Sequence, residues 1–338
     1  MAMKVRSFHE KGGIIKIKPY ALSLGDTIGV VAPAGVVDSV QLNKGIKVLK
    51  DLGFDVYLGK TVKKLINRGY FSASDEERAN DLNEMFSNEK IKAIFCASGG
   101  YGSMRILPLL DYDLIKRNPK IFVGYSDITA LLIAIHQKTG LIVFHGPMVA
   151  SDMHNLSEYT KHNMMKVLMN DEPLGEILNP IDGPLIRVIN DGRSEGDLIG
   201  GNLSLIVSTL GTPYEIDTEG KILFIEDTNE APYRVDRMLT QLILAGKLDN
   251  VKGIIICEFK NYEPSKPKYT FSLEEVIQDR IGRLNIPAIY GLCCGHGEHK
   301  ITLPIGVKTT LDATNAVLRI DEPAVIRNKS SNFINHYI

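Results

Sequence analysis

The chain has 338 residues, with 39 lysines and arginines against 40 aspartates and glutamates. This length is enough to bury a large core and predicts two domains. The nearly balanced charge gives no indication of a polyanionic partner, so we expect no nucleic-acid partner. The sequence contains no apolar run of the roughly 18 residues that span a bilayer, and residues 1–16 are too polar for a signal peptide. We therefore expect no membrane partner.

The cysteines indicate a reducing environment. Cys96, Cys257, Cys293 and Cys294 contain no C-x-x-C pair and do not resemble a disulfide framework. Cys293 and Cys294 are neighbours in an apolar stretch, where we interpret them as small buried hydrophobic residues. The cytoplasm is the location that this pattern favours.

The first half of the chain repeats a unit of apolar strand, turn and helix. The strands are predicted over residues 26–32, 54–58, 91–97, 121–123 and 141–144, and the main helices over 39–52, 74–86, 128–138 and 157–169. Ser74 and Glu77 form the sequence pattern of a capping box at one helix start. The alternation predicts an α/β, Rossmann-like domain over residues 1–172, with a parallel sheet. Functional residues of such sheets gather beyond the carboxyl ends of the strands.

The second half has shorter strands and more turns. A segment rich in proline and glycine over residues 173–185 is predicted to be a linker, followed by a β-rich α+β domain over 186–338 with a barrel-like or curled sheet. Its predicted strands cover residues 185–189, 221–225, 251–257, 301–303, 306–311 and 316–320, and its helices cover 233–245 and 273–283. Residues 260–270 are interpreted as a basic loop.

A candidate nucleophile lies in the segment KIFVGYSDITA, residues 120–130. Ser126 stands at the turn between the predicted strand and helix, where a sharp bend exposes a hydroxyl and leaves amide groups free for an oxyanion. The segment departs from the G-x-S-x-G elbow, because Ile128 occupies the last position. Ser126 or Asp127 could instead simply cap the helix.

A glycine-rich turn precedes this segment by one strand. Gly99, Gly100 and Gly102 lie in SGGYGS, where bare amides could supply an oxyanion donor next to a nucleophile. The turn could also cradle a phosphate, although it lacks the dinucleotide spacing and the lysine of a P-loop. A tight turn that needs positive φ is the third interpretation, and it is compatible with the first.

Two clusters in the second half supply an acid and a base. Glu226 and Asp227 end an apolar strand, and His296 lies between glycines in CCGHGEHK. Ser126, Glu226 and His296 thus offer a nucleophile, an orienting carboxylate and a general base, which would meet across a domain interface. Glu230 is better explained as an acidic helix start.

A metal site at the second cluster is the competing interpretation. His296, Glu298 and His299 have side chains that bind zinc, but their spacing is not H-E-x-x-H. We therefore predict no metal.

Several blocks of the sequence together resemble the LD-carboxypeptidase family of serine peptidases. They are GDTIGVVAPAG, ASGGYGS, VGYSDITALLIAIHQKTGLIVFHGPM, GGNLSLI, LFIEDTNEAPYRVDRML and GHGEHKITLPIG, in this order between about residues 23 and 307. The resemblance implies a catalytic triad of Ser126, Glu226 and His296, with oxyanion donors from the backbone of Asp127 and of Gly99 or Gly100. It also implies a Rossmann-like domain joined to a β-rich domain, a homodimer and no cofactor. The implied reaction removes the terminal D-alanine from cytoplasmic murein tetrapeptides during cell-wall recycling.

A carboxypeptidase also needs a cation for the free carboxylate of its substrate. Arg234, Arg237 and Arg105 are candidates, and Arg234 is the one we select for the binding site. Each of them could equally form a surface or interhelical ion pair.

Two other functions stay open. The microcin-immunity peptidases are a sister branch that cleaves aminoacyl-nucleotide conjugates, for which an aromatic platform would be expected. The absence of tryptophan disfavours that branch, while the 13 tyrosines leave it possible. A non-catalytic binding protein on the same scaffold would use Ser126 as a helix cap and the glycine turns as anion nests.

Overall fold

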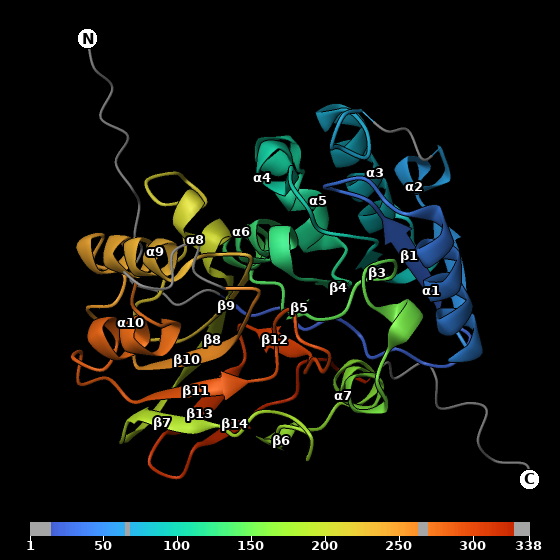
Figure 1. Ribbon diagram of the computed structural model, residues 1–338. Helices are drawn as coiled ribbons and strands as arrows, with labels where there is room; N and C mark the ends of the chain where they lie inside the picture. The colour runs from blue at the N-terminus through green and yellow to red at the C-terminus, as the bar shows by residue number, and fades with distance from the viewer. Residues whose placement is uncertain (1–14, 65–67, 263–269, 328–338) are drawn as a thin grey trace, which may run out of the picture.

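Two β-sheets organise the protein in the computed structural model, which describes residues 15–64, 68–262 and 270–327 (Figure 1). The first sheet has the strand order β12-β5-β4-β3-β1-β2, in which β5 to β2 are parallel. This order is that of a doubly wound sheet. Its parallel strands are β1 (Thr27–Val31), β2 (Asp55–Leu58), β3 (Ile91–Cys96), β4 (Ile121–Gly124) and β5 (Val143–His145).

Helices join these parallel strands. The strands are almost wholly buried in the centre of the sheet, as their unbroken apolar sequences predict for strands with both faces covered. The predicted capping box is confirmed, because Ser74 and Glu77 bond to each other's backbone at the start of α3. The helices of this half are α1 (Ser39–Asp51), α2 (Lys60–Lys64), α3 (Asp75–Ser87), α4 (Ser103–Ile106), α5 (Tyr112–Arg117), α6 (Thr129–Thr139) and α7 (Glu158–Met169), with short 3₁₀ turns at Leu107–Leu109, Ser126–Ile128 and Met153–Asn155.

The second sheet is mixed and has the order β6-β14-β13-β8-β9-β10-β11-β7. Its centre, from β8 to β11, is parallel, and the outer strands are antiparallel. The sheet is open with β6 and β7 at its edges, so no barrel closes. The elements of this half are β6 (Gly175–Ile177), β7 (Arg187–Asn190), β8 (Arg193–Asn202), α8 (Leu203–Ser208), β9 (Ile222–Thr228), α9 (Pro232–Leu244), β10 (Gly253–Lys260), α10 (Leu273–Arg280), β11 (Ala288–Leu292), β12 (Leu303–Ile305), β13 (Lys308–Asp312) and β14 (Val317–Ile320).

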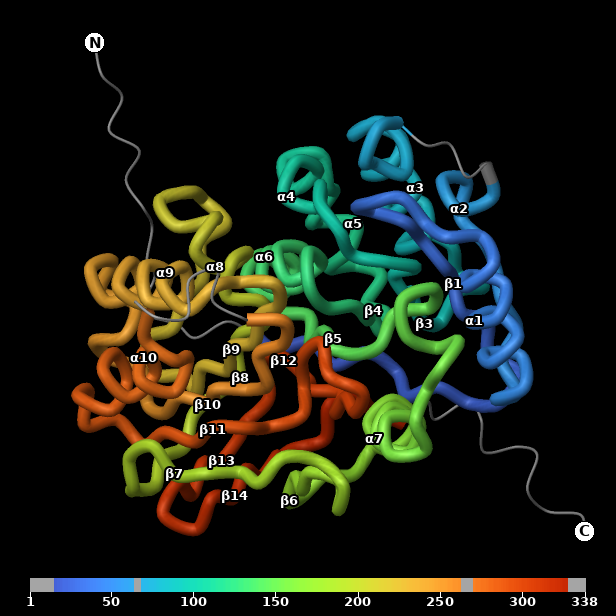
Figure 2. The backbone as a smooth tube through the Cα atoms, in the orientation of Figure 1, coloured from blue at the N-terminus to red at the C-terminus, as the bar shows by residue number. Residues whose placement is uncertain are grey.

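The two halves of the chain are joined by more than the connecting segment. Figure 2 shows the blue-to-green chain in the right and upper part of the molecule and most of the yellow-to-red chain in the left and lower part. β12 nevertheless belongs to the first sheet, where Leu303 pairs with His145 of β5. β6, inside the predicted linker, belongs to the second sheet. The segment between β11 and β12, which carries His296, is therefore held by both sheets.

The cysteine prediction was wrong for one pair, because Cys257 and Cys294 form a disulfide. Cys257 is the last residue of the unbroken buried run at the start of β10, and it lies opposite Leu292 of the neighbouring parallel strand β11. The chain then turns after β11, which returns Cys294 to within a Cα distance of 6.0 Å from Cys257. Spacing along the sequence does not reveal this proximity, because it depends on strand order. Cys96 and Cys293 are buried and free.

Over the described ranges, each helix is too short or too polar to cross a bilayer. The predicted basic loop at residues 260–270 falls largely on residues 263–269, outside the described residues.

Candidate active site

Ser126 lies at the carboxyl end of β4, at the bend predicted from the sequence. Its backbone adopts a φ of 60°, the left-handed region that side-chain-bearing residues rarely occupy. The bend is tight at Gly124, because a Cβ there would lie 2.7 Å from Cγ2 of Ile128. Ser126 begins a 3₁₀ turn that leads into α6, and no side-chain hydrogen bond caps that turn. The strained backbone is typical of a nucleophile elbow rather than of an ordinary helix cap.

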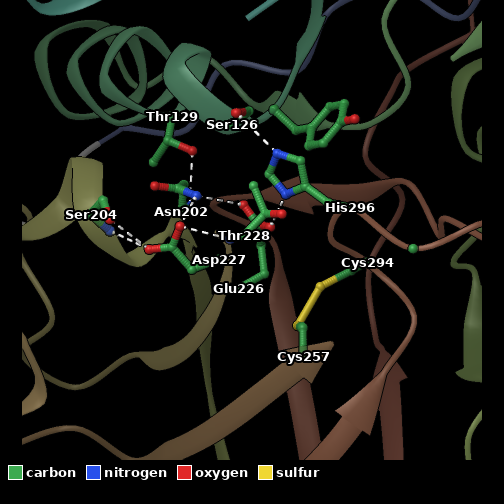
Figure 3. A network of polar contacts seen from close by, with 12 residues as sticks. Ser126, Thr129, Asn202, Ser204, Glu226, Asp227, Thr228, Cys257, Cys294 and His296 are labelled. Atoms are coloured by element: carbon green, nitrogen blue, oxygen red, sulfur yellow. Dashed lines mark hydrogen bonds and ion pairs between the residues drawn. A yellow bond between two sulfur atoms is a disulfide. The ribbon is translucent and has the colours of Figure 1, made fainter. Parts of the chain in front are cut away.

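Ser126, His296 and Glu226 form a continuous chain of hydrogen bonds (Figure 3). The Nδ1 atom of His296 lies 2.7 Å from Oε2 of Glu226, and its Nε2 atom lies 3.1 Å from Oγ of Ser126. Because a carboxylate only accepts hydrogen bonds, Nδ1 carries the proton and Nε2 of the neutral ring can accept from the hydroxyl. The arrangement can move a proton from Ser126 to His296.

Burial and charge act in opposite directions on His296. Burial alone would lower the pKa of the imidazole, but the hydrogen bond and negative charge of Glu226, with the charge of Asp227, outweigh it. The pKa of His296 is therefore raised above its usual value of 6.5. The positive charge of Lys300 opposes this rise. Glu226 itself has no exposed surface, so its partners hold it in place.

Asn202, which sequence reasoning missed, connects the acid to its surroundings (Figure 3). It ends β8 directly opposite Glu226 and donates from Nδ2 to both Glu226, at 3.3 Å, and Asp227, at 3.0 Å. Its backbone N–H donates to Thr129 Oγ1 at the start of α6. An asparagine after two glycines at a strand end was the available signal. The contact with Thr129 links the acid of the second sheet to the helix that follows Ser126.

Asp227 is bound by a second set of donors. Ser204 donates to its carboxylate from both the backbone N–H, at 2.9 Å, and the hydroxyl, at 2.7 Å. Burial raises the pKa of Asp227, although these bonds oppose the rise. Of the two carboxylates, Glu226 is the one that hydrogen-bonds to His296, and it is the residue that the sequence predicted for this position.

The glycine loop lies against Ser126. A Cβ built on Gly99 would be 3.2 Å from Cβ and 3.4 Å from Oγ of Ser126, and 3.5 Å from the backbone nitrogen of Asp127. Gly100 has a φ of 96° and packs on Gly35, so the turn does need its glycines. The Asp127 carboxylate accepts from the N–H of Ser103 at 2.8 Å, which fixes the loop to the bend. The structure thus brings Gly99, Asp127 and Ser126 together.

The candidate arginines are all engaged or exposed. Arg234 pairs with Glu230 and donates to the carbonyl of Asn229, while Arg105 makes several hydrogen bonds to Asp75. Arg237 is exposed. Within the described part of the chain, neither Arg234 nor Arg105 forms a hydrogen bond to Ser126 or His296.

The residues of the metal interpretation point in different directions. His299 contacts Ser157 Oγ at 3.1 Å and Asp182 at 3.3 Å, whereas Glu298 is exposed and His296 bonds to the triad partners. Residues 15–64, 68–262 and 270–327 contain no cluster of three or more side chains arranged to hold a metal ion.

Sequence comparisons decide the family. The profile of the LD-carboxypeptidase N-terminal domain matches residues 28–146, and that of the C-terminal domain matches residues 195–311. A probable murein peptide carboxypeptidase of Bacillus subtilis (strain 168) is 44% identical over 310 residues, which cover 91% of this chain and 95% of that protein. The chain belongs to the LD-carboxypeptidase family. Membership supports a peptidase activity and confirms the resemblance seen in the sequence.

Two further relatives are a microcin self-immunity protein and a muramoyltetrapeptide carboxypeptidase. The microcin C7 self-immunity protein MccF of Escherichia coli is 33% identical over 329 residues, covering 89% of this chain and 94% of MccF. A structure of MccF in complex with aspartyl sulfamoyl adenosine has a TM-score of 0.84 at 30% identity, with 92% of this chain and 100% of that chain covered. A muramoyltetrapeptide carboxypeptidase from Oxalobacter formigenes has a TM-score of 0.77 at 33% identity, with 88% and 99% covered.

Proposed function

We propose that this LD-carboxypeptidase family member is a serine carboxypeptidase that releases the terminal D-alanine from murein tetrapeptides through an acyl-enzyme. The observation that carries the proposal is the hydrogen-bonded chain from Ser126 through His296 to the buried Glu226. The Bacillus subtilis relative, a probable murein peptide carboxypeptidase, and the Oxalobacter formigenes muramoyltetrapeptide carboxypeptidase support the substrate class. The proposed setting is cytoplasmic cell-wall recycling, and the proposed assembly is a homodimer.

Acylation begins with Ser126. Its Oγ atom attacks the scissile carbonyl carbon as Nε2 of His296 takes the hydroxyl proton, and Glu226 stabilises the imidazolium. The carbonyl oxygen becomes an oxyanion, for which the N–H groups of Asp127 and of Gly99 or Gly100 are the proposed donors. The C–N bond then breaks, and the proton passes from His296 to the amine of the leaving D-alanine.

Deacylation repeats the same steps with water. His296 removes a proton from water, the resulting hydroxide attacks the ester carbon, and the C–O bond to Ser126 breaks. The proton returns from His296 to the Ser126 oxygen, which restores the hydroxyl and releases the shortened peptide as a carboxylic acid. Arg234 is the proposed cation for the substrate carboxylate, for which it would exchange part of its contact with Glu230.

The test is release of D-alanine from a murein tetrapeptide by the wild type and by Ser126→Ala, each with and without EDTA. We expect release by the wild type, no change with EDTA, and a fall in kcat on the order of 10⁶ for the variant. Loss of activity with EDTA would contradict the metal-independent mechanism. Equal activity of Ser126→Ala would contradict the assignment of the nucleophile.

One observation favours a second substrate class, the aminoacyl-nucleotide conjugates. Tyr101 belongs to the glycine loop and is 48% exposed. The ring of Tyr70, which is 65% exposed, lies beside it, with the two ring centroids 5.7 Å apart. Such rings can stack on a base, and the MccF complex contains aspartyl sulfamoyl adenosine. Aspartyl sulfamoyl adenosine is therefore the second test substrate. Cleavage of it without D-alanine release would move the proposal to the microcin-immunity branch. A non-catalytic binder would cleave neither compound.

A further inference from the structure

A buried lysine lies next to the loop that carries the base. Lys300 is only 7% exposed, and its Nζ atom donates to the carbonyl of Gly297 at 2.7 Å. The same Nζ atom lies 3.0 Å from Oδ1 of Asp152. Gly297 directly follows His296, so the lysine hydrogen-bonds to the loop backbone one residue after His296. Burying an ammonium group is costly unless it is paired, and this pairing connects the loop to a distant part of the chain.

The partner of Lys300 is fixed within the first half of the chain. The carboxylate of Asp152 accepts from the N–H of Met148 at 2.8 Å and from the hydroxyl of Tyr125 at 3.0 Å. Tyr125 precedes Ser126, and its ring centroid lies 4.9 Å from that of His296. The Nζ atom of Lys300 lies 5.5 Å from the same tyrosine ring. These contacts therefore link Tyr125, which precedes the nucleophile, to Gly297, which follows the base, through Asp152 and Lys300.

We propose that Lys300 is a positioning residue for His296, which it holds against Ser126 by joining Gly297 of the base loop to Asp152 and Tyr125. The inference rests on the proposed serine mechanism. Glu226 fixes only one edge of the imidazole, through Nδ1. The Lys300 network fixes the backbone of the loop, because it joins the segment between β11 and β12 to Asp152, which follows β5. A displacement of about 1 Å at a reacting group can cost about 100-fold in rate.

The charge of Lys300 also acts on the pKa of His296, which a purely structural residue far from the site would not do. Lys300 lowers the pKa of His296, against the larger opposite effect of Glu226. The titratable and charged groups around His296 are Glu226 and Asp227 from β9, His145 from β5, Glu258 from β10, Tyr125, Asp152 and Lys300. Removal of the lysine charge should raise the pKa of His296. Removal of the Asp152 charge should lower it, because Lys300 then acts uncompensated.

The experiment compares Lys300→Met and Asp152→Asn with a matched control, Lys120→Met. Lys120 is 8% exposed and donates to the carbonyls of Asn88 and Ile91, so it is also a buried lysine bound to backbone. It precedes β4 at the amino end, opposite the Ser126 bend. The readouts are the pH profile of kcat/KM and the titration of the His296 ring by NMR of protein labelled with ¹⁵N-histidine.

For Lys300→Met we expect kcat/KM to fall about 10- to 100-fold. The acidic limb of its pH profile should move up by about half to one pH unit. Asp152→Asn should move the limb down, and Lys120→Met should leave it in place. A cavity of about 160 Å³ borders Lys300, Asp152 and Gly297. Propylammonium should therefore partly restore Lys300→Ala, as the lost ammonium group would be replaced.

The outcomes separate this inference from the proposed function. The NMR titration does not require turnover, so it reports on His296 even if no substrate is cleaved. An active wild type in which Lys300→Met and Lys120→Met give the same pH profile and the same His296 titration overturns the inference alone. A wild type that cleaves neither test substrate, with Lys300→Met still shifting the titration, overturns the proposed function and leaves the electrostatic effect of Lys300 on His296 established.

Discussion

The Nδ1 atom of His296 lies 2.7 Å from Oε2 of Glu226, a carboxylate with no exposed surface. Glu226 belongs to the second sheet, while Ser126, on the other side of the imidazole, follows a strand of the first. The hydrogen bond fixes the tautomer in which Nε2 faces the hydroxyl. The chemistry of the site therefore depends on how the two sheets are joined.

Glu226→Gln should lower kcat by about 10³- to 10⁴-fold, because the amide can donate to Nδ1 and favour the wrong tautomer. The pH profile should change as well. Glu226 raises the pKa of His296, and the base must be neutral to act, so the wild-type acidic limb should lie above the usual histidine value. In the variant the pKa falls and the limb should move to lower pH. A limb that stays in place or moves up would show that Glu226 does not set this pKa.

Ser126→Gly and Ser126→Ala should both be inactive but should differ in stability. The backbone of Ser126 has a φ of 60°, which costs an alanine more than a glycine. We expect the glycine variant to exceed the alanine variant by about 1 kcal/mol in free energy of unfolding. Urea unfolding at equal protein concentration measures the difference. Equal midpoints would mean that the bend relaxes when the serine side chain is removed.

Gly99→Ala tests the loop beside the nucleophile. The new methyl group would lie 3.2 Å from Cβ and 3.4 Å from Oγ of Ser126, so it should displace the hydroxyl and crowd the proposed oxyanion position. We expect kcat to fall by about 100-fold, the size of the loss of one oxyanion donor. Gly25→Ala is the control, since its φ of 86° strains the backbone with no atom within 4 Å of the new Cβ. Loss of activity in both variants would point to instability instead.

The residues of the hydrogen-bonded triad could be found from the sequence because local features mark each of them. Ser126 and Glu226 end apolar strands, and His296 stands between glycines in a loop. Such signals need no knowledge of strand order. The parallel sheet of the first half was predictable for the same reason, since short apolar strands alternate with helices there.

The remaining features depend on pairings between distant segments. β8 was missed because RSEGDLIGGN is charged and glycine-rich, although its second half is buried between β9 and α6. Three other features join residues 37 or more positions apart in the sequence. They are the pairing of β12 with β5 in the first sheet, the disulfide of Cys257 and Cys294, and the ion pair of Lys300 and Asp152. Local patterns cannot predict contacts set by the register of two sheets.

Glu322 should stabilise the protein in a pH-dependent way. Burial acts to raise the pKa of its carboxyl, but Lys18, the N–H of Lys308 and Lys16 outweigh it and lower the pKa from 4.5 to about 2. The carboxylate joins the two ends of the described chain, with Lys18 at 2.7 Å and Lys16 at 3.0 Å. A lowered pKa stabilises the folded state above the unfolded value, and this stabilisation is lost as the pH falls through the folded value.

Glu322→Gln should therefore lower the free energy of unfolding by about 1–3 kcal/mol at pH 7, with the difference from wild type shrinking between pH 4.5 and about 2. Urea midpoints measured across this range provide the test. Glu158→Gln is the matched control, because the 87% exposed Glu158 pairs with Lys161 on the surface, where removal of an ion pair should change stability by less than about 1 kcal/mol. A constant difference between Glu322→Gln and wild type from pH 7 to pH 2 would show that packing of the side chain, rather than its charge, holds the two ends together.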